Sequence, residues 1–582
     1  MAKTTNPKDD IDQDAMTAVH AATSPPATAS HGRTRNEIID SVTDYFIDDL
    51  KKNPRNITPE QIATELTLLL EEQFNLENAM RPRGISQYRP PLVLPPDVIA
   101  ELMAYRFHIK RIALSGLGVD AEYDLIGMYV DEGTDEGIYT TSEIELTKAA
   151  RRFNRRLTKK EFDEIIFTLK TLVERDERCN ERDLIVVNNG IYNYVTKELL
   201  PFTPDKVFVT KSHVDYNHAA QNIVIHNDAD GTDWDIESWM KELNDDPNVV
   251  NLLWQLLGAA IRPNVSWNKS AWFYAQSGNN GKGTLCELMR ALCGERTHVS
   301  LKLSDLGKEF MLEPLVHASA IITDENAVGK YIDDVANLKA IITNDIVPMN
   351  RKHKEPISFR FRGFMVQCVN EMPRVRDKSD SFYRRQLFIP FEKSYTGCER
   401  KYIKDDYIKR PEVLEYVLLR VLEMMPDYYE LAEPACCKAA LDEYKEYNDP
   451  VRQFLVEMLP RFKWDLLPND FLYDLYREWF KRNNPSGSIQ GKSSFLSELR
   501  QFISTANKDW IDNTKKPTRS NNRMVDPEPL IFEYELKNWY NKLYTGSNPD
   551  RISTTIPKAV YRGLLRASAH SPSDDESDTE DE

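Results

Sequence analysis

The sequence is poor in cysteine and has no long apolar runs. Its 582 residues include seven cysteines, and no two of them form a C-x-x-C pair. Such a chain offers neither a disulfide framework nor a zinc motif, so we expect a reduced, intracellular protein. No run of 18 apolar residues and no signal peptide is recognisable. We therefore expect neither a membrane-spanning segment nor secretion, and no membrane partner.

The chain also lacks the positive charge that a protein coating nucleic acid would carry. Its formal net charge is −17, and seven of the excess negative charges fall between Asp574 and Glu582, where no basic residue occurs. Because such a segment cannot bury apolar surface, we expect residues 546–582 to be a disordered acidic tail. Contacts with nucleic acid must then come from local basic clusters.

Residues 271–290, AWFYAQSGNNGKGTLCELMR, have the order that a phosphate-binding loop requires. An apolar run leads into a Gly-rich turn, and a helix-like run follows. Glycines allow backbone N–H groups to surround phosphate oxygens, and the helix N-terminus adds its positive dipole end. The predicted nucleotide-binding residues, with Lys282 on the β- and γ-phosphates, are Ser277, Gly278, Asn279, Asn280, Gly281, Lys282, Gly283 and Thr284.

The strict pattern G-x-x-x-x-G-K-[ST] fails at two positions of this loop. Gln276 stands where the first Gly belongs, and Gly283 stands where a hydroxyl would bind Mg²⁺. Thr284 is the nearest hydroxyl and is therefore the candidate metal ligand. A Gly-rich loop that binds no nucleotide remains the alternative.

Polar side chains follow two further apolar runs. Asp324 and Glu325 follow the run 318–323, and Asn370 follows the run 364–369. In a nucleoside-triphosphatase one carboxylate holds Mg²⁺ and another activates the attacking water, while a polar residue at a neighbouring strand end orients that water. The alternative is a pair of strands that end in polar turns.

Basic residues gather at three other places. Arg384 and Arg385 precede an apolar run, as an arginine finger would, and such a finger often serves the neighbouring subunit of a ring. Arg351, Lys352 and Lys354 form the basic tip of an expected hairpin that could contact a phosphate backbone, although a solvated turn is the alternative. A third group follows three short amphipathic helices between 449 and 502, and it consists of Lys515, Lys516, Arg519 and Arg523.

Four stretches occur in the order and spacing of the superfamily III helicases: SGNNGKGT, TDEN, LKAIITNDIVPMNRKHKEPISFRF and VNEMPRVRDKSDSFYRRQLFIPFE. The chain most resembles the primase-helicase branch found in poxviruses, phages and plasmids, over roughly residues 120–395. This resemblance implies an AAA+-like ATPase that uses ATP and Mg²⁺. It also implies a hexameric ring on single-stranded and forked DNA that usually translocates 3′ to 5′.

The resemblance also assigns roles to single residues. It makes Lys282 the phosphate-binding lysine, Asp324 and Glu325 the Walker B acids, with Asp324 at the metal, and Asn370 the sensor. Arg384 or Arg385 becomes the finger, and Lys352 or Lys354 the DNA-contacting tip. Family members usually have Ser at the position of Gly283, so the Mg²⁺ ligand is the doubtful part of the assignment.

The expected fold is α/β, with an AAA+-like P-loop ATPase core, a helical N-terminal region and a C-terminal winged-helix-like domain. In such a domain Lys515, Lys516, Arg519 and Arg523 would contact DNA, although a plain packing domain is the alternative. The expected segments are a disordered leader (1–33), a helical module with a proline-rich connector (34–96), an α+β lead-in domain (97–240), the ATPase core (241–445), the winged-helix-like domain (446–545) and the acidic tail (546–582).

These observations favour a replicative ATP-dependent DNA helicase of a phage, virus or mobile element, located in the cytoplasm of a host cell. Replication proteins could bind its N-terminal module or its acidic tail. The first 120 residues are too short for the primase domain that relatives often carry, so no primase activity is expected. A ring-forming initiator that binds origin DNA without processive unwinding is the alternative. A non-catalytic interaction protein would require Gly283 to prevent hydrolysis.

Overall fold

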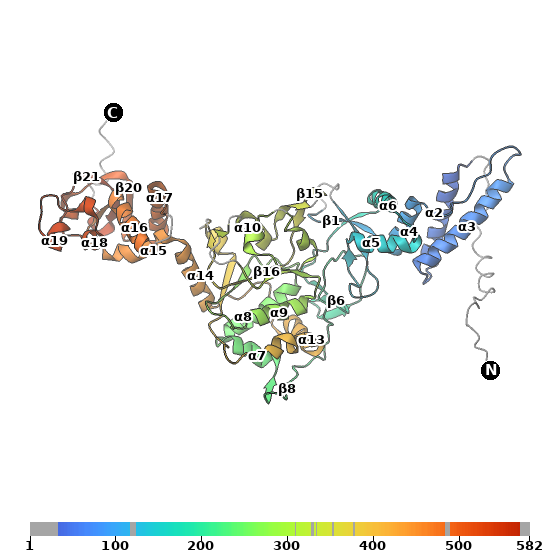
Figure 1. Cartoon of the computed structure of the whole chain (residues 1–582), viewed down its shortest axis with the longest axis horizontal. Helices are drawn as coiled ribbons and strands as arrows, with labels where there is room; N and C mark the ends of the chain where they lie inside the picture. Colours follow the sequence, from blue (N-terminus) through green and yellow to red (C-terminus); the bar gives the residue numbers. More distant parts are fainter. Residues whose placement is uncertain are drawn as a thin grey trace.

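The computed structural model describes residues 33–116, 124–308, 310–326, 331–332, 335–351, 354–375, 377, 379–483 and 489–570. Figure 1 shows three bodies in a row, with a central α/β body between an N-terminal and a C-terminal one. The helix α14 (Ala435–Asn448) leads from the central body to the C-terminal body. Residues 1–32 of the predicted leader and 571–582 of the predicted tail lie outside the described residues.

The N-terminal body combines helices with a small sheet. Its helices are α2 (Arg35–Lys52), α3 (Pro59–Ala79), α4 (Pro96–Arg106), α5 (Glu143–Phe153) and α6 (Lys159–Leu172). Its strands, in the sheet order β3-β2-β1-β4, are β1 (Lys110–Ala113), β2 (Leu125–Tyr129), β3 (Tyr139–Thr140) and β4 (Arg175–Glu177). Thr58 caps the start of α3, because the Thr58 and Gln61 side chains each accept a hydrogen bond from the other residue's backbone N–H.

The boundary expected between residues 96 and 97 is wrong. Ile38 of α2 and Leu66 of α3 share one core with Ile99 of α4 and Ile165 of α6. A pair of amphipathic helices cannot cover both apolar stripes, so α2 and α3 need α4, α5 and α6 to complete a core. The helical module is therefore part of a larger domain that continues to β4.

The second half of the expected lead-in domain belongs to the central body instead. It contains β5 (Leu184–Val187), β6 (Gly190–Asn193), β7 (Glu198–Leu200), β8 (Ile225–Asn227), β9 (Thr232–Trp234) and α7 (Ile236–Leu243). The strands β5 and β6 pair antiparallel as a hairpin. Ile185 and Trp234 lie in the same core as Leu285 of the central body, so residues 97–240 are not one domain.

A parallel five-stranded sheet organises the central body. Its strands, in the order β11-β12-β16-β10-β18, are β10 (Ser270–Tyr274), β11 (His298–Val299), β12 (Ala320–Thr323), β16 (Phe364–Val369) and β18 (Gln386–Pro390). Apart from the two-residue edge strand β11, these strands are buried and largely apolar, as parallel strands covered on both faces require. Mixed α/β architecture with a parallel sheet, expected for a P-loop core, is thereby confirmed.

Helices cover both faces of this sheet. The helices α8 (Pro247–Ile261), α9 (Lys282–Cys293) and α13 (Pro411–Leu419) pack on the face that carries Ala271 and Phe273. The opposite face carries Trp272 and is covered by α10 (Val335–Ile342) and α14. Alternate residues of β10 thus enter two different cores, which is the arrangement of a three-layer α/β/α domain.

Shorter elements complete the central body. They are η2 (Leu303–Asp305), η3 (Glu313–His317), β13 (Tyr331–Ile332), β17 (Arg374–Val375), α11 (Asp380–Tyr383), α12 (Lys401–Asp405), η4 (Tyr407–Lys409) and η5 (Arg420–Met424). The expected basic hairpin is formed by β14 (Ile346–Arg351) and β15 (Lys354–Arg360), which pair antiparallel. None of the described helices has both the length and the apolar composition that crossing a bilayer requires.

The C-terminal body places three helices beside an antiparallel three-stranded sheet. Its main elements are α15 (Pro450–Met458), β19 (Leu466–Pro468), α16 (Asn469–Asn483), α17 (Lys492–Ala506), β20 (Trp510–Arg519) and β21 (Val560–Arg566). Between β20 and β21 lie η7 (Asn521–Met524), α18 (Pro529–Glu533), η8 (Lys537–Trp539) and α19 (Pro549–Ile552). The three amphipathic helices expected between 449 and 502 are confirmed.

The expected end of this domain at residue 545 is wrong. The strand β21 is the middle strand of the sheet and pairs with both β19 and β20. Its sequence VYRGLLR contains two arginines and a glycine. These residues are uncommon in buried strands, so the sequence alone does not predict one here. Gly563 is needed there because a Cβ atom would lie 1.9 Å from the carbonyl oxygen of Leu467. The folded domain therefore continues to about residue 566, and the described chain to 570.

Candidate nucleotide-binding site

The Gly-rich loop connects β10 to α9, as its sequence predicts. Gly281 caps α9 with a φ of 86°, a conformation that favours glycine, and an added Cβ would lie 2.5 Å from Leu243 Cδ2. The backbone N–H of Tyr395 donates a hydrogen bond to the carbonyl oxygen of Asn279, which links the loop to the segment that contains Tyr395. The backbone N–H groups at the start of α9 have no intrahelical partner, so this end suits an anion.

Lys282 is the first residue of α9, and its side chain is buried. Its Nζ donates to Asn370 Oδ1 at 2.9 Å and to the carbonyl oxygen of Ala275 at 3.5 Å. Burial lowers the pKa of Lys282. The Lys282 ammonium therefore donates to two neutral oxygens. A bound phosphate would supply a negative charge and would stabilise the charged form of this buried amine.

The acidic pair follows β12, beside the strand that leads to Asn370. Asp324 Oδ2 accepts a hydrogen bond from Arg290 Nη1 at 2.9 Å, while Asp324 Oδ1 is buried without a partner. Burial acts to lower the pKa of Arg290, but the hydrogen bond and charge of Asp324 outweigh it and raise this pKa. Glu325 is exposed. An unpartnered carboxylate oxygen beside an exposed carboxylate is the oxygen donor set that Mg²⁺ favours, so these residues fit that ion.

The carboxyl ends of β10, β12 and β16 lie side by side, because these three strands are parallel neighbours. One open cleft at this edge brings together Lys282, Asp324, Glu325 and Asn370. From the loop, Ser277, Gly278, Asn279, Asn280 and Gly283 also line it. The cleft additionally contains residues that the sequence patterns do not indicate, namely Arg290, Ser300, Lys302 and Lys404.

The metal-binding hydroxyl of Thr284 stays a prediction. Gly283 lines the cleft, and Thr284, the next residue of α9, does not. A Cβ added at Gly283 would have one neighbour, Lys404 Nζ at 3.6 Å, which is an ordinary contact. A serine would therefore fit at 283, and the lysine of α12 lies beside the place its hydroxyl would take.

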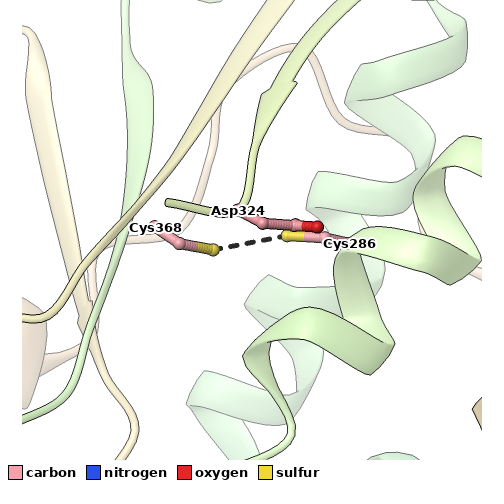
Figure 2. Close-up of side chains that lie close together, drawn as sticks. All are labelled: Cys286, Asp324 and Cys368. Carbon is pink, nitrogen blue, oxygen red and sulfur yellow. Dashed lines mark hydrogen bonds between the residues drawn. The ribbon is translucent and has the colours of Figure 1, made fainter. Parts of the chain in front are cut away.

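Two buried cysteines lie under the cleft, next to Asp324. Figure 2 shows Cys286 of α9 and Cys368 of β16 with their Sγ atoms pointing towards each other and Asp324 beside them. The Sγ atoms are 3.4 Å apart. The hydrogen bond with Cys368 and burial raise the pKa of Cys286 well above its usual range. Cys286 is thus a neutral thiol, and its contact with Cys368 joins the loop helix to the strand that precedes Asn370.

The two candidate finger arginines lie at the amino ends of the strands, opposite the carboxyl ends that form the cleft. Arg384 and Arg385 precede β18, and the backbone N–H of Ser270, at the start of β10, donates to the carbonyl oxygen of Arg385. The five residues of β10, roughly 3.3 Å each, separate this end from the loop by about 16 Å. The Arg385 guanidinium donates to the carbonyl oxygen of Ser381, whereas Arg384 is exposed. Neither can reach the cleft of its own chain.

The predicted DNA-binding residues fall into two groups. Arg351 and Lys354 end the paired part of β14 and β15, while Lys352 and the side chain of Lys354 lie outside the described residues. Lys515, Lys516 and Arg519 lie on β20 and are exposed. The guanidinium of Arg523 instead donates to the carbonyl oxygens of Arg519 and Ala569. This bonding gives Arg523 a structural role at the end of the domain.

Three family models match separate parts of the chain. The family described as D5 N terminal like matches residues 102–245, and the poxvirus D5 protein-like family matches residues 446–535. The chain thus has D5-like segments on both sides of its nucleotide-binding loop. Between these two matches, the family of unknown function DUF5906 covers residues 273–385 of this D5-like chain, which include the loop, the acidic pair and the two arginines.

The D5-like chain is also similar to a protein of Acanthamoeba polyphaga mimivirus whose name describes it as a helicase. The two are 23% identical over 402 residues, which cover 62% of this chain and 39% of the mimivirus protein. The chain thus matches less than half the length of that relative.

Among solved structures, the chain is similar to two apo structures of the NrS-1 C-terminal region. One is 14% identical, with a TM-score of 0.42, and covers 81% of this chain and 100% of that one. The other is 13% identical, with a TM-score of 0.40, and covers 76% and 90%. These scores are too low to establish a shared overall arrangement.

Proposed function

We propose that this D5-like protein is an ATP-dependent replicative DNA helicase of a virus, phage or mobile element. In this proposal it acts as a hexameric ring on single-stranded and forked DNA and moves 3′ to 5′. The observation that carries the proposal is the convergence of Lys282, Asp324 and Asn370 in one cleft at the carboxyl edge of a parallel sheet. Ligands of α/β sheets bind at that edge.

Each side chain of the cleft has a chemical task in ATP hydrolysis. Lys282 would move from Asn370 to the β- and γ-phosphates, and the released Asn370 amide would orient the attacking water. Asp324 would hold Mg²⁺ through its unpartnered oxygen, and the exposed Glu325 would accept the proton of the water. The bound Mg²⁺ would neutralise charge that develops on the phosphate oxygens. Lys302 and Lys404 add positive charge at the cleft wall.

The position of Arg384 supports a ring. It is exposed at the edge of the sheet opposite its own cleft. An exposed arginine at that edge can reach a triphosphate only across an interface with another copy of the chain. In head-to-tail rings such an interface repeats until the ring closes. Arg384 is therefore the finger in this proposal, and Arg385, which is bonded to Ser381, positions it.

The C-terminal body supports a DNA contact. Its elements follow the order helix, strand, helix, helix, strand, strand, and the sheet order β19-β21-β20 is that of a winged helix. In such domains the third helix, here α17, enters the major groove and the strand hairpin contacts phosphates. The basic part of β20, with Lys515, Lys516 and Arg519, occupies the wing position. An inserted segment of short helices replaces the usual tight wing turn.

The proposal is tested by measuring ATP hydrolysis with and without single-stranded DNA. The wild-type protein is expected to hydrolyse ATP faster when the DNA is present. Lys282→Ala should reduce hydrolysis by about a hundredfold or more, because one preorganised charge contact at a transition state is worth that much. Hydrolysis that is unaffected by Lys282→Ala would overturn the site. DNA-independent hydrolysis would favour a remodelling ATPase over a helicase.

A further inference from the structure

A strongly basic turn joins α5 to α6 in this acidic chain. From Leu146 to Lys160, seven of fifteen residues are Lys or Arg, and none is Asp or Glu. They are Lys148, Arg151, Arg152, Arg155, Arg156, Lys159 and Lys160. Seven basic residues in so short a stretch oppose the chain's net charge of −17, so their surroundings need an explanation.

Contacts within the N-terminal body account for four of these seven residues. Arg152 makes a two-pronged ion pair with Glu60 of α3, at 3.0 and 3.3 Å, and joins the two helices. Lys148 pairs with Glu145 and Lys160 with Glu164, and Arg151 donates to the carbonyl oxygen of Leu157. These four residues have structural partners.

Arg155, Arg156 and Lys159 have no such explanation. All three are exposed, and within the described part of the chain no ion pair is recorded for them. Arg155 and Arg156 follow the last residue of α5, Phe153, so they lie outside the last helical turn, where a cation would stabilise the helix dipole. Lys159 and Lys160 lie in the first turn of α6, where the dipole favours acids. The helix dipoles thus give no reason for Arg155 and Arg156 and oppose Lys159, as local forces can at sites that bind a charged partner.

The basic turn adjoins a groove that leads to the β14–β15 hairpin. On one side this groove is lined by Lys148, Arg151, Lys159 and Lys170 of α5 and α6, and on the other by Met349, Arg351 and Ile357 of the hairpin. Figure 1 shows α5 and α6 at the side of the N-terminal body that faces the central body. Asp124, Glu143, Asp163 and Glu313 also line the groove, so its charges are nearly balanced and the excess of basic residues lies at the adjoining α5–α6 turn.

Exposed apolar side chains lie in the same groove. Ile144 is 68% exposed and Phe310 is 43% exposed. Phe310 has a φ of 64°, a conformation that a bulky residue rarely adopts and that commonly marks a functional position. Single-strand binding surfaces combine basic residues that contact the backbone with aromatic side chains on which bases stack, and the basic turn and Phe310 offer these two features side by side with the groove.

We propose that Arg155, Arg156 and Lys159 bind the phosphate backbone of a single-stranded nucleic acid that runs through this groove towards the β14–β15 hairpin. The identity of the ligand rests on the proposed function. The α5–α6 turn is a separate contact from the hairpin tip and from β20. It would hold the strand outside the central body while the hairpin engages it.

The test uses the full chain and a fluorescent single strand of about 30 nucleotides, with anisotropy measured over a range of NaCl concentrations. Each phosphate contact on a single strand contributes about 0.7 to the slope of log K against log salt. Replacing Arg155, Arg156 and Lys159 by Ala should therefore lower the slope by about 2 and weaken binding about tenfold or more at ~0.1 M salt. ATP hydrolysis without DNA and the unfolding midpoint should stay unchanged.

Two further variants make the outcome decisive. Lys51, Lys52 and Arg83 are exposed basic residues elsewhere in the N-terminal body, and their replacement by Ala should leave the slope unchanged. Arg155→Lys with Arg156→Lys keeps the charge and should keep the slope, which also covers the case that the triple variant fails to fold.

Equal slopes for the triple variant and the Lys51, Lys52, Arg83 control would overturn the surface assignment. If a peptide of residues 571–582 then bound the control and not the triple variant, the acidic tail would be the occupant instead. In either case a wild-type protein that hydrolyses ATP and separates strands would leave the proposed function intact. Loss of hydrolysis in Lys282→Ala addresses that function separately.

Discussion

At the scale of single residues, Gly283 separates this chain from the common P-loop pattern. A glycine there removes the hydroxyl that normally binds Mg²⁺, and Thr284 does not line the cleft. Lys404 lies 3.6 Å from the place of a Cβ atom at 283. The ammonium of Lys404 is thus close to where a metal-binding hydroxyl would be.

Restoring the hydroxyl should strengthen the use of Mg²⁺. Gly283→Ser adds a side chain for which the structure has room, so the Mg²⁺ concentration that gives half-maximal ATP hydrolysis should fall severalfold. Gly283→Ala adds only the Cβ atom and is the matched control, which should leave that concentration unchanged. The titration is followed by phosphate release at a fixed ATP concentration. A weaker Mg²⁺ response for the serine variant would mean that position 283 does not face the metal.

Another single residue makes stability depend on pH. His317 of η3 lies 2.9 Å from Thr141 Oγ1 of the N-terminal body. Burial, with a contribution from the positive charge of Arg178, lowers the pKa of His317 to about 4. The folded protein therefore favours the neutral imidazole, and the unfolded chain takes up the proton first as the pH falls. The stabilisation is present above about pH 6.5 and is lost progressively towards pH 4.

The expected loss is on the order of 2 kcal/mol between these two pH values. It is measured as the difference in unfolding free energy between the wild type and His317→Gln, so that titration of acidic groups cancels. The wild type should lose more stability than the variant as the pH falls from 7 to 4.5. Parallel pH profiles would show that His317 is accessible to protons in the folded state.

At the scale of helices and strands, contiguous patterns were predictable and distant ones were not. The loop between β10 and α9 could be predicted because apolar run, glycines and helix follow one another in the sequence. Asp324 and Asn370 could be placed because parallel strands bring their carboxyl ends to one edge. The place of Lys404 could not be predicted, because α12 lies far from α9 in the sequence and only the tertiary fold brings the two helices together.

The middle strand of the C-terminal sheet was missed for a similar reason. The strand β21 contains two arginines and a glycine, so only its pairing with β19 and β20 reveals its place. The N-terminal boundary failed because α2 and α3 complete their core with helices from further along the chain. Local patterns specify an element, whereas the partners that bury it lie elsewhere in the sequence.

Truncation tests the corrected C-terminal boundary. A chain that ends at Thr545 lacks β21 and should leave β19 and β20 unpaired, because these strands do not bond to each other. Its residues 446–545 should be cleaved rapidly in limited proteolysis, whereas a chain that ends at His570 should resist like the full protein. Equal resistance of both truncated chains would show that β21 is dispensable for the C-terminal fold.

At the scale of the whole molecule, a ring predicts that subunits share active sites. Arg384→Ala should lower hydrolysis about 10³-fold or more, as loss of an arginine finger does, although the residue lies far from its own cleft. Lys282→Ala should also be inactive. Mixing the two inactive proteins should restore part of the activity, since some interfaces then combine an intact Lys282 with an intact Arg384. Arg384→Lys is expected to be far less active than the wild type.

The three bodies together suggest a division of labour within one chain. The central body holds the nucleotide cleft, the basic turn of the N-terminal body adjoins the groove towards the hairpin, and the C-terminal body carries basic residues on β20. Hydrolysis in the cleft can do work on DNA only if these surfaces hold one strand at the same time. ATP hydrolysis is therefore expected to drive strand separation.

The most direct measurement is unwinding of a forked duplex with one labelled strand, in the presence of ATP and Mg²⁺. The wild-type protein should release the labelled strand, Lys282→Ala should not, and a fork with only a 3′ single-stranded arm should suffice. Hydrolysis without strand release, on forks of either polarity, would contradict the helicase assignment. The protein would then be a ring ATPase that binds or remodels DNA.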